Sequence, residues 1–215
     1  MATVDDLVHE LRRADGEPAG ALVLLHGRGT SERDLEPLFD VFDPDRRLVG
    51  ACPRGPLQLP PIGNHWYAVP RVGYPDPETF IATYERLAGW LDSLAEHVGV
   101  PPERTVIGGF SQGAVMAWAM GLGTGRPRPA GILAMSGFIP TVPGFELDLD
   151  GLAGFPIAIS HGSADPIISV EFARDARDRS RAAGADVLYR ETDVPHMIDP
   201  RVVPGLVDWV AKRFG

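Results

Sequence analysis

Cysteine is nearly absent from the chain, because Cys52 is the only one among 215 residues. A single thiol excludes an internal disulfide and a metal cluster built from cysteines. Since Cys52 ends an apolar run, we expect it to be a small core residue rather than a reactive thiol.

Basic residues and long apolar runs are also scarce. The 20 Lys and Arg residues face 29 Asp and Glu, which gives a formal net charge of −9 and a pI near 5.1. Nucleic acid and anionic membranes both require a basic face, so we expect neither as a partner and no stable membrane association. No apolar run reaches the length that spans a bilayer, and the opening MATVDDLVHEL has acids where a secretory signal has a basic region. A cytoplasmic protein is therefore expected.

Strand-like apolar runs alternate with segments of helical periodicity. The expected strands are 21–27, 47–53, 105–110, 131–138, 156–162 and 186–192, and the expected helices are 78–98, 112–122, 168–183 and 202–213. This alternation predicts an α/β fold, a mostly parallel central sheet with helices on both faces, within a single domain over 1–215. The opening differs, because two strand-like pieces joined by GEPAG at 16–20 predict an antiparallel N-terminal edge hairpin.

A long loop rich in proline and glycine occupies 53–77, PRGPLQLPPIGNHWYAVPRVGYPDP. Loops of this length in compact domains usually cover or line a site. Only a short segment separates the strands at 131–138 and 156–162, which leaves no room for a cap domain. We therefore expect the loop and this segment to cover the site.

Apolar residues of both segments are candidates for a groove that binds the acyl part of a substrate. They are Leu57, Leu59, Ile62, Trp66, Tyr67, Ile139, Val142 and Phe145. Ordinary packing of these side chains on the core is the alternative. For Trp66 the two roles are a wall of the groove and an anchor of the loop, and we favour the wall.

The stretch TVIGGFSQGAVMAWAM, 105–120, joins a strand-like run to a helix-forming run at Ser111. Gly109 and Gly113 stand two residues away on either side. A turn sharp enough to push one hydroxyl outward needs hydrogen side chains at these positions, so Ser111 is a candidate nucleophile. The alternative is a serine that only caps the helix.

Polar residues follow other strands of the predicted sheet, at the edge where ligands of α/β proteins bind. Asp165 comes after the strand at 156–162 and His196 after the strand at 186–192. A serine nucleophile needs a base, and the base needs an acid that fixes its tautomer, so we assign these roles to His196 and Asp165. Asp193 and Asp199 are second choices for the acid.

Two more groups of residues complete the predicted site. Backbone N–H groups of Arg28, in a Gly-rich turn, and Gln112, at the helix start, are candidates for an oxyanion hole. His26 and His161 each precede a glycine at a strand end, and we interpret both as structural, hydrogen-bonded turn histidines.

The motifs LHGRG, GGFSQGAVMA, HGSADPII and the histidine before MIDP resemble the phospholipase/carboxylesterase family of α/β-hydrolases, which includes small bacterial carboxylesterases and acyl-protein thioesterases. The resemblance runs from about Leu22 to Trp209. It implies an α/β-hydrolase fold, carboxylic ester hydrolysis, no cofactor, and backbone donors at Arg28 and Gln112. One position departs from the pattern: Ala68 stands where relatives often carry an acid after the aromatic pair, and this bears on substrate preference.

The function expected from these residues is that of a serine carboxylesterase. It acts on small to medium acyl esters, small-molecule substrates, through an acyl-enzyme intermediate. Lysophospholipase and acyl-protein thioesterase activities use the same residues and remain alternatives. A non-catalytic binding protein of the same fold is the alternative of another class, and a complete Ser, Asp and His set argues against it. A homodimer is left open.

Overall fold

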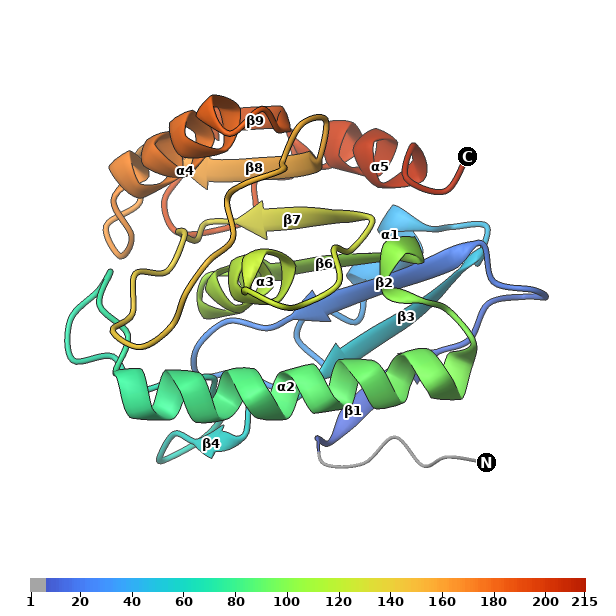
Figure 1. Cartoon of the computed structure of the whole chain (residues 1–215), viewed down its shortest axis with the longest axis horizontal. Coiled ribbons are helices and arrows are strands. Elements are labelled where there is room, and N and C mark those ends of the chain that lie inside the picture. The colour runs from blue at the N-terminus through green and yellow to red at the C-terminus, as the bar shows by residue number, and fades with distance from the viewer. Residues whose placement is uncertain (1–6) are drawn as a thin grey trace.

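A computed structural model describes residues 7–215 (Figure 1). Its main sheet has seven strands in the order β1-β3-β2-β6-β7-β8-β9. They are β1 (His9–Arg12), β2 (Gly20–Leu25), β3 (Leu48–Pro53), β6 (Thr105–Phe110), β7 (Gly131–Met135), β8 (Pro156–Gly162) and β9 (Asp186–Thr192). Every neighbouring pair is parallel except β1 with β3. A separate antiparallel pair, β4 (Leu57–Gln58) and β5 (Asn64–His65), lies within the long loop.

Helices cover both faces of the sheet, which confirms the predicted fold class. They are α1 (Leu38–Phe42), α2 (Pro77–Val98), α3 (Gln112–Leu122), α4 (Val170–Ala182) and α5 (Val203–Ala211), with a 3-10 turn at Pro102–Arg104. Side chains of α2, α3 and α4 join one core cluster, and those of α1 and α5 join the other. Strand β2 contributes side chains to both clusters. Val23 and Leu25 belong to the first cluster, and Leu22 and Leu24 belong to the second. A strand buried on both faces reads as a continuous apolar run, as this one does.

The predicted N-terminal hairpin is wrong in its pairing. Strand β1 does lie antiparallel at the edge, but its partner is β3, with His9 opposite Pro53. Strand β3 takes the place between them and pairs in parallel with β2, Gly20 opposite Leu48. The GEPAG turn shows that the chain reverses. The turn does not reveal that Leu48–Pro53 will insert between the two strands. This run is buried throughout, so the backbone N–H and C=O groups on both of its edges need hydrogen-bond partners.

The long loop is fastened where it enters α2. The side chain of Asp76 caps the helix by accepting from Thr79 N at 2.9 Å, and Pro77 begins the helix. The loop backbone folds onto this start, because Ala68 N donates to Thr79 Oγ1 at 3.0 Å and Asp76 N donates to Ala68 O at 3.0 Å. The residue that departs from the family pattern therefore packs against the helix cap.

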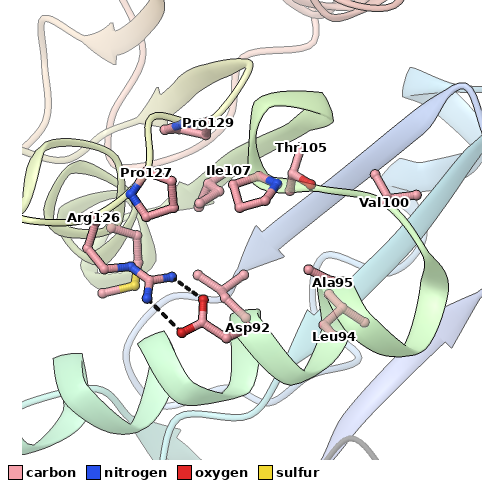
Figure 2. Close-up of a pocket in the computed structure, with 12 residues that line it drawn as sticks. Asp92, Leu94, Ala95, Val100, Thr105, Ile107, Arg126, Pro127 and Pro129 are labelled. Atoms are coloured by element: carbon pink, nitrogen blue, oxygen red, sulfur yellow. Dashed lines mark hydrogen bonds and ion pairs between the residues drawn. The ribbon is translucent and has the colours of Figure 1, made fainter. Parts of the chain in front are cut away.

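A cavity lies beside α2 near the start of β6, at the edge of the sheet away from the ends where Ser111 stands (Figure 2). Arg126 and Asp92 form a bidentate ion pair across it, with N–O distances of 2.7 and 2.8 Å. Its other lining side chains are mostly aliphatic or proline. Apart from this ion pair, its lining has no cluster of titratable or nucleophilic side chains.

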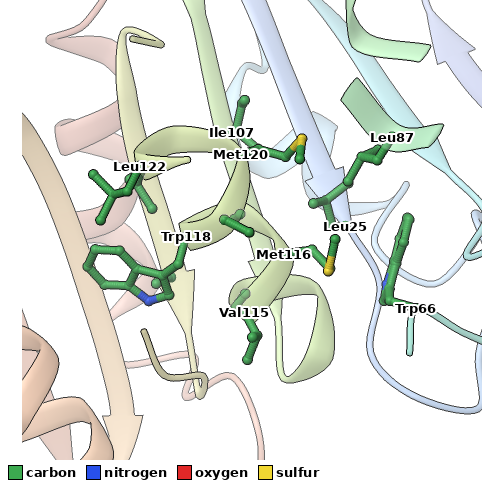
Figure 3. Close-up of a cluster of buried hydrophobic side chains, with 14 of the residues drawn as sticks. Leu25, Trp66, Leu87, Ile107, Val115, Met116, Trp118, Met120 and Leu122 are labelled. Carbon is green, nitrogen blue, oxygen red and sulfur yellow. The ribbon is translucent and has the colours of Figure 1, made fainter. Parts of the chain in front are cut away.

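Helix α3 runs through the centre of the molecule, and all of its residues are buried. A helix that is apolar on every side belongs in a core. Trp66, from the long loop, packs in the same cluster as Met116 of α3, Leu25 of β2 and Leu87 of α2 (Figure 3). The loop is thus tied into the core next to the start of α3.

Among residues 7–215, no helix combines the length and the apolarity that crossing a bilayer requires.

Candidate active site

The turn between β6 and α3 is strained and carries Ser111 at its tip, where the residue is 8% exposed. Ser111 has φ 55° and ψ −119°, a conformation that residues with a side chain rarely adopt. The flanking glycines make it possible: a Cβ on Gly113 would lie 1.8 Å from Leu25 O, and one on Gly109 would lie 2.4 Å from the carbonyl carbon of Gly113. The Ser111 side chain makes no cap hydrogen bond to α3, so the capping interpretation is wrong.

The structure brings the three predicted residues into one hydrogen-bonded chain. Ser111 Oγ lies 2.9 Å from His196 Nε2, and His196 Nδ1 lies 2.6 Å from Asp165 Oδ2. A carboxylate only accepts, so Nδ1 carries the proton and Nε2 is the acceptor for the serine hydroxyl. The imidazole also packs against the ring of Phe110, with centroids 4.9 Å apart.

Asp165 is held as a carboxylate. Burial on its own would raise its pKa, but the hydrogen bond from His196 and those from Ile168 N and Ile167 N outweigh burial and lower it. The two amides donate to Oδ1 at 2.9 and 2.8 Å, which leaves Oδ2 for the imidazole. The side chain is fully buried, so this carboxylate orients His196 without access to water.

The rival acids are engaged elsewhere. Asp193 is 83% exposed and lies 2.6 Å from Arg201, and Asp199 also pairs with Arg201. The same guanidinium therefore holds both carboxylates beside the histidine turn. Both rivals pair with Arg201, whereas Asp165 pairs with the imidazole of His196.

His26 and His161 both occupy buried, hydrogen-bonded positions. Burial is the main cause that lowers the pKa of each, so both are neutral near pH 7. His161 Nε2 lies 2.8 Å from Ile168 O and so fastens the turn that holds Asp165. His26 Nε2 accepts from Gly55 N at 2.8 Å, which ties the Gly-rich turn to the long loop.

Residues 64–67, which we call the strap, cross from the Gly-rich turn to the start of α3. On the first side, Gly29 N donates to Asn64 O and Asn64 N donates to Thr30 O, both at 2.8 Å. The indole Nε1–H of Trp66 donates to His26 O at 2.8 Å. These three bonds fix the turn that carries Arg28.

On the second side, the strap is held by the side chain of Gln112. Its Oε1 accepts from Trp66 N at 3.0 Å, and its Nε2 donates to Tyr67 O at 2.9 Å. All of these groups are buried, so an unmade bond here would cost about 1–3 kcal/mol. The strap therefore joins the two backbone segments that carry the predicted oxyanion donors.

Arg28 and Gln112 line the same cavity as Ser111. The first N–H groups of a helix have no partner inside the helix, so the N–H of Gln112 is a candidate donor to a group bound in this cavity. Two fixed amides beside a nucleophile are the arrangement that stabilises an oxyanion.

The cavity is lined differently from the predicted groove. Tyr67 lines it, and the apolar lining otherwise comes from the second half of the loop and from two segments beyond β7 and β8: Val69, Val72, Tyr74, Pro75, Phe138, Ile167 and Ile168.

The other candidates for the groove lie elsewhere. Ile62 is 83% exposed at the tip between β4 and β5, a hairpin in which Leu57 pairs with His65.

The candidates from the segment after β7 pack on the core. Ile139 and Val142 belong to the core cluster, and Phe145 packs on Phe80 and Tyr84 of α2. Leu59 lines a surface hollow around the hairpin tip. Apolar character did not reveal which way each side chain faces once the segments fold back.

Trp66 is an anchor rather than a wall. Its side chain is 0% exposed, and both of its N–H groups are bonded to buried acceptors. The sequence signal that marked it, an indole in a long loop, fits both roles, and only the depth of burial decides between them.

Within residues 7–215, no group of three or more His, Cys, Asp or Glu side chains is arranged to hold a metal ion.

The sheet order, the strained turn after β6 and the histidine after β9 define the class of the protein as an α/β-hydrolase. The chain belongs to the phospholipase/carboxylesterase family, whose model matches residues 9–213.

Known proteins agree with this placement. The putative hydrolase MhqD of Bacillus subtilis is 26% identical over 199 residues, which cover 93% of this chain and 96% of that protein. Acyl-protein thioesterase 1 of Neurospora crassa is 35% identical over 98 residues, and this match covers 42% of the chain and only 38% of that protein. The crystal structure of the Bacillus cereus carboxylesterase superposes with a TM-score of 0.85 at 24% identity, covering 96% and 94% of the two chains, and so shares the fold.

The close contact at the turn predicts the effect of filling it. Gly113→Ala should lower the free energy of unfolding by about 3 kcal/mol or more, because the new Cβ meets the backbone of β2. Gly89→Ala is the matched control: this exposed glycine of α2 has nothing within 4 Å, so alanine should stabilise by about 0.5–1 kcal/mol. Urea denaturation measures both, and equal stability of the two variants would contradict the close contact.

The anchor role of Trp66 predicts a uniform loss. Trp66→Ala should lower the melting temperature, since removing a buried indole costs about 3–5 kcal/mol, and should reduce kcat/KM alike for short and long acyl esters. Val69→Ala, which trims the cavity lining, should instead change the ratio between chain lengths by up to about tenfold with little loss of stability. A chain-length-selective loss in Trp66→Ala at unchanged melting temperature would restore the wall interpretation.

Proposed function

We propose that the protein is a serine carboxylesterase that cleaves small to medium acyl esters through an acyl-enzyme. The observation that carries this proposal is the hydrogen-bonded chain from Ser111 through His196 to Asp165, with distances of 2.9 and 2.6 Å. Membership in a family of hydrolases supports it.

The geometry fits two half-reactions. In the first, Ser111 Oγ attacks the ester carbonyl as its proton passes to His196 Nε2, and the N–H groups of Arg28 and Gln112 bind the oxyanion. The imidazolium then gives its proton to the leaving alcohol. In the second, a water molecule gives a proton to the same nitrogen and attacks the acyl carbonyl, and the acid is released as the imidazolium returns that proton to Ser111 Oγ.

The buried carboxylate explains why the histidine is effective as a base. Asp165 accepts from Nδ1–H, so the neutral imidazole presents the lone pair of Nε2 to the serine. The carboxylate also stabilises the imidazolium that forms in the transition state. A thioester or a lysophospholipid would pass through the same steps, and acyl-protein thioesterase or lysophospholipase activity is therefore the alternative. The cytoplasmic location and the state of assembly stay predictions from the sequence.

A binding protein of the same fold is the alternative of another class. Binding alone gives no reason to bury a carboxylate against His196 or to strain Ser111 into the left-handed region. Covalent labelling decides between the two classes.

The first prediction of this mechanism concerns the nucleophile. A fluorophosphonate should label the wild-type protein at Ser111, and Ser111→Ala should stay folded while kcat falls by several orders of magnitude, about 10³-fold or more. Peptide mapping by mass spectrometry and hydrolysis of 4-nitrophenyl esters measure the two effects. Labelling at another residue, or full activity in the variant, would refute the assignment.

The second concerns the acid. Asp165→Asn can keep the bonds from Ile167 N and Ile168 N to Oδ1, but it presents an amide donor to His196 and so favours the wrong imidazole tautomer. We expect kcat to fall about 10³- to 10⁴-fold with a small change in melting temperature. Asp193→Asn, at the exposed rival, should keep kcat within about twofold of wild type. The reverse ranking would reassign the acid.

A further inference from the structure

The cavity beside Ser111 carries positive charge in an acidic protein. Its charged lining side chains are Arg28 and Arg71, and it has no acidic lining residue, although the whole chain has a net charge of −9. Both guanidinium groups are exposed, and within residues 7–215 neither forms an ion pair with a carboxylate. A neutral ester has no group that needs them.

Arg71 is held in place by a tight turn. Tyr74 N donates to Arg71 O at 3.0 Å, and Gly73 between them has φ 85°. A Cβ on Gly73 would lie 2.6 Å from the ring of Phe172, so the turn packs closely against α4. The backbone of Arg71 is therefore fixed relative to the rest of the site.

The side chain of Arg71 stacks on the ring of Tyr74. Its guanidinium lies 3.6 Å from the centre of the Tyr74 ring. Stacking of this kind occupies the flat face of the group and leaves the N–H groups at its edge free to bind a carboxylate by two parallel hydrogen bonds. The stacking reduces the side-chain entropy that is lost when an anion binds.

We propose that Arg71 recognises a carboxylate at the far end of the acyl group, so that the preferred substrates are esters of ω-carboxy acids. The rest of the cavity lining is mostly apolar and includes Tyr67, Phe138 and Ile168, which suits a chain of methylene groups. The side chain of Arg28 adds positive charge to the same space. The inference rests on the proposed esterase function and names its substrate class.

The experiment compares matched pairs of esters. Mono-4-nitrophenyl adipate and suberate carry the carboxylate, and their methyl esters are neutral with almost the same shape. At low ionic strength we expect kcat/KM for the anionic member to exceed that for the neutral one by about fivefold in at least one pair. About 0.5 M salt should reduce this ratio, because the recognition is exposed to solvent.

Variants assign the preference to one residue. Arg71→Gln should bring the ratio close to one, and Arg71→Lys should keep part of it. Arg13→Gln is the matched control. Arg13 is also exposed, but it follows β1, at the end of the sheet where the parallel strands β2 and β3 begin. This variant changes the net charge equally and should keep the wild-type ratio. A guanidinium that only supports the turn would change the melting temperature and leave the ratio unchanged.

A wild-type ratio near or below one for both pairs, or the same ratio in Arg71→Gln as in wild type, overturns the proposal. Cleavage of the neutral esters together with labelling of Ser111 would then still support the esterase function. Calorimetry with Ser111→Ala tests recognition without turnover. Adipate should bind at least about fivefold more tightly than its dimethyl ester, and Arg71→Gln should abolish the difference, whereas equal binding overturns the inference whether or not esters are cleaved.

Discussion

The site depends on one close contact between α3 and the end of β2. The second residue of the helix, Gly113, lies so near Leu25 O that a Cβ would stand only 1.8 Å away. This approach forces the strained turn at Ser111 and sets the first N–H groups of α3 beside the chain that continues from β2 into Arg28. Backbone packing thus places the proposed nucleophile and the proposed oxyanion donors beside one another.

The strap makes this arrangement rigid. Gln112 binds it with both atoms of its amide, and Trp66 binds back to His26. Gln112, the proposed source of one oxyanion N–H, therefore also holds the loop whose next residues line the cavity. Donors that are fixed before the reaction need no reorganisation when charge develops, which is how such groups lower a barrier. Because the bonds are buried, weakening one of them affects the turn, the helix start and the cavity wall together.

Local sequence signals were enough to predict that Ser111, Asp165 and His196 lie together, because each follows its own strand and parallel strands bring their carboxyl ends to one edge. The glycines at 109 and 113 likewise predicted the sharp turn directly.

The residues that line the cavity could not be predicted from local sequence signals. Whether Trp66 or Val69 lines the cavity depends on contacts between segments far apart in the chain, such as that of Trp66 with Gln112. The local sequence of apolar residues contains no information about these contacts. The partner of β1 was missed for the same reason, since a turn signal fixes the reversal of the chain and not the pairing.

The most direct measurement of the central claim is a crystal structure of the protein after reaction with a phosphonate ester, whose tetrahedral phosphorus stands for the oxyanion intermediate. The account predicts a covalent bond to Ser111 Oγ and a phosphonyl oxygen about 2.7–3.1 Å from both Arg28 N and Gln112 N. The strap bonds of Trp66 and Gln112 should remain as they are in the free protein. An adduct at another residue, or a phosphonyl oxygen turned away from both amides, would contradict it.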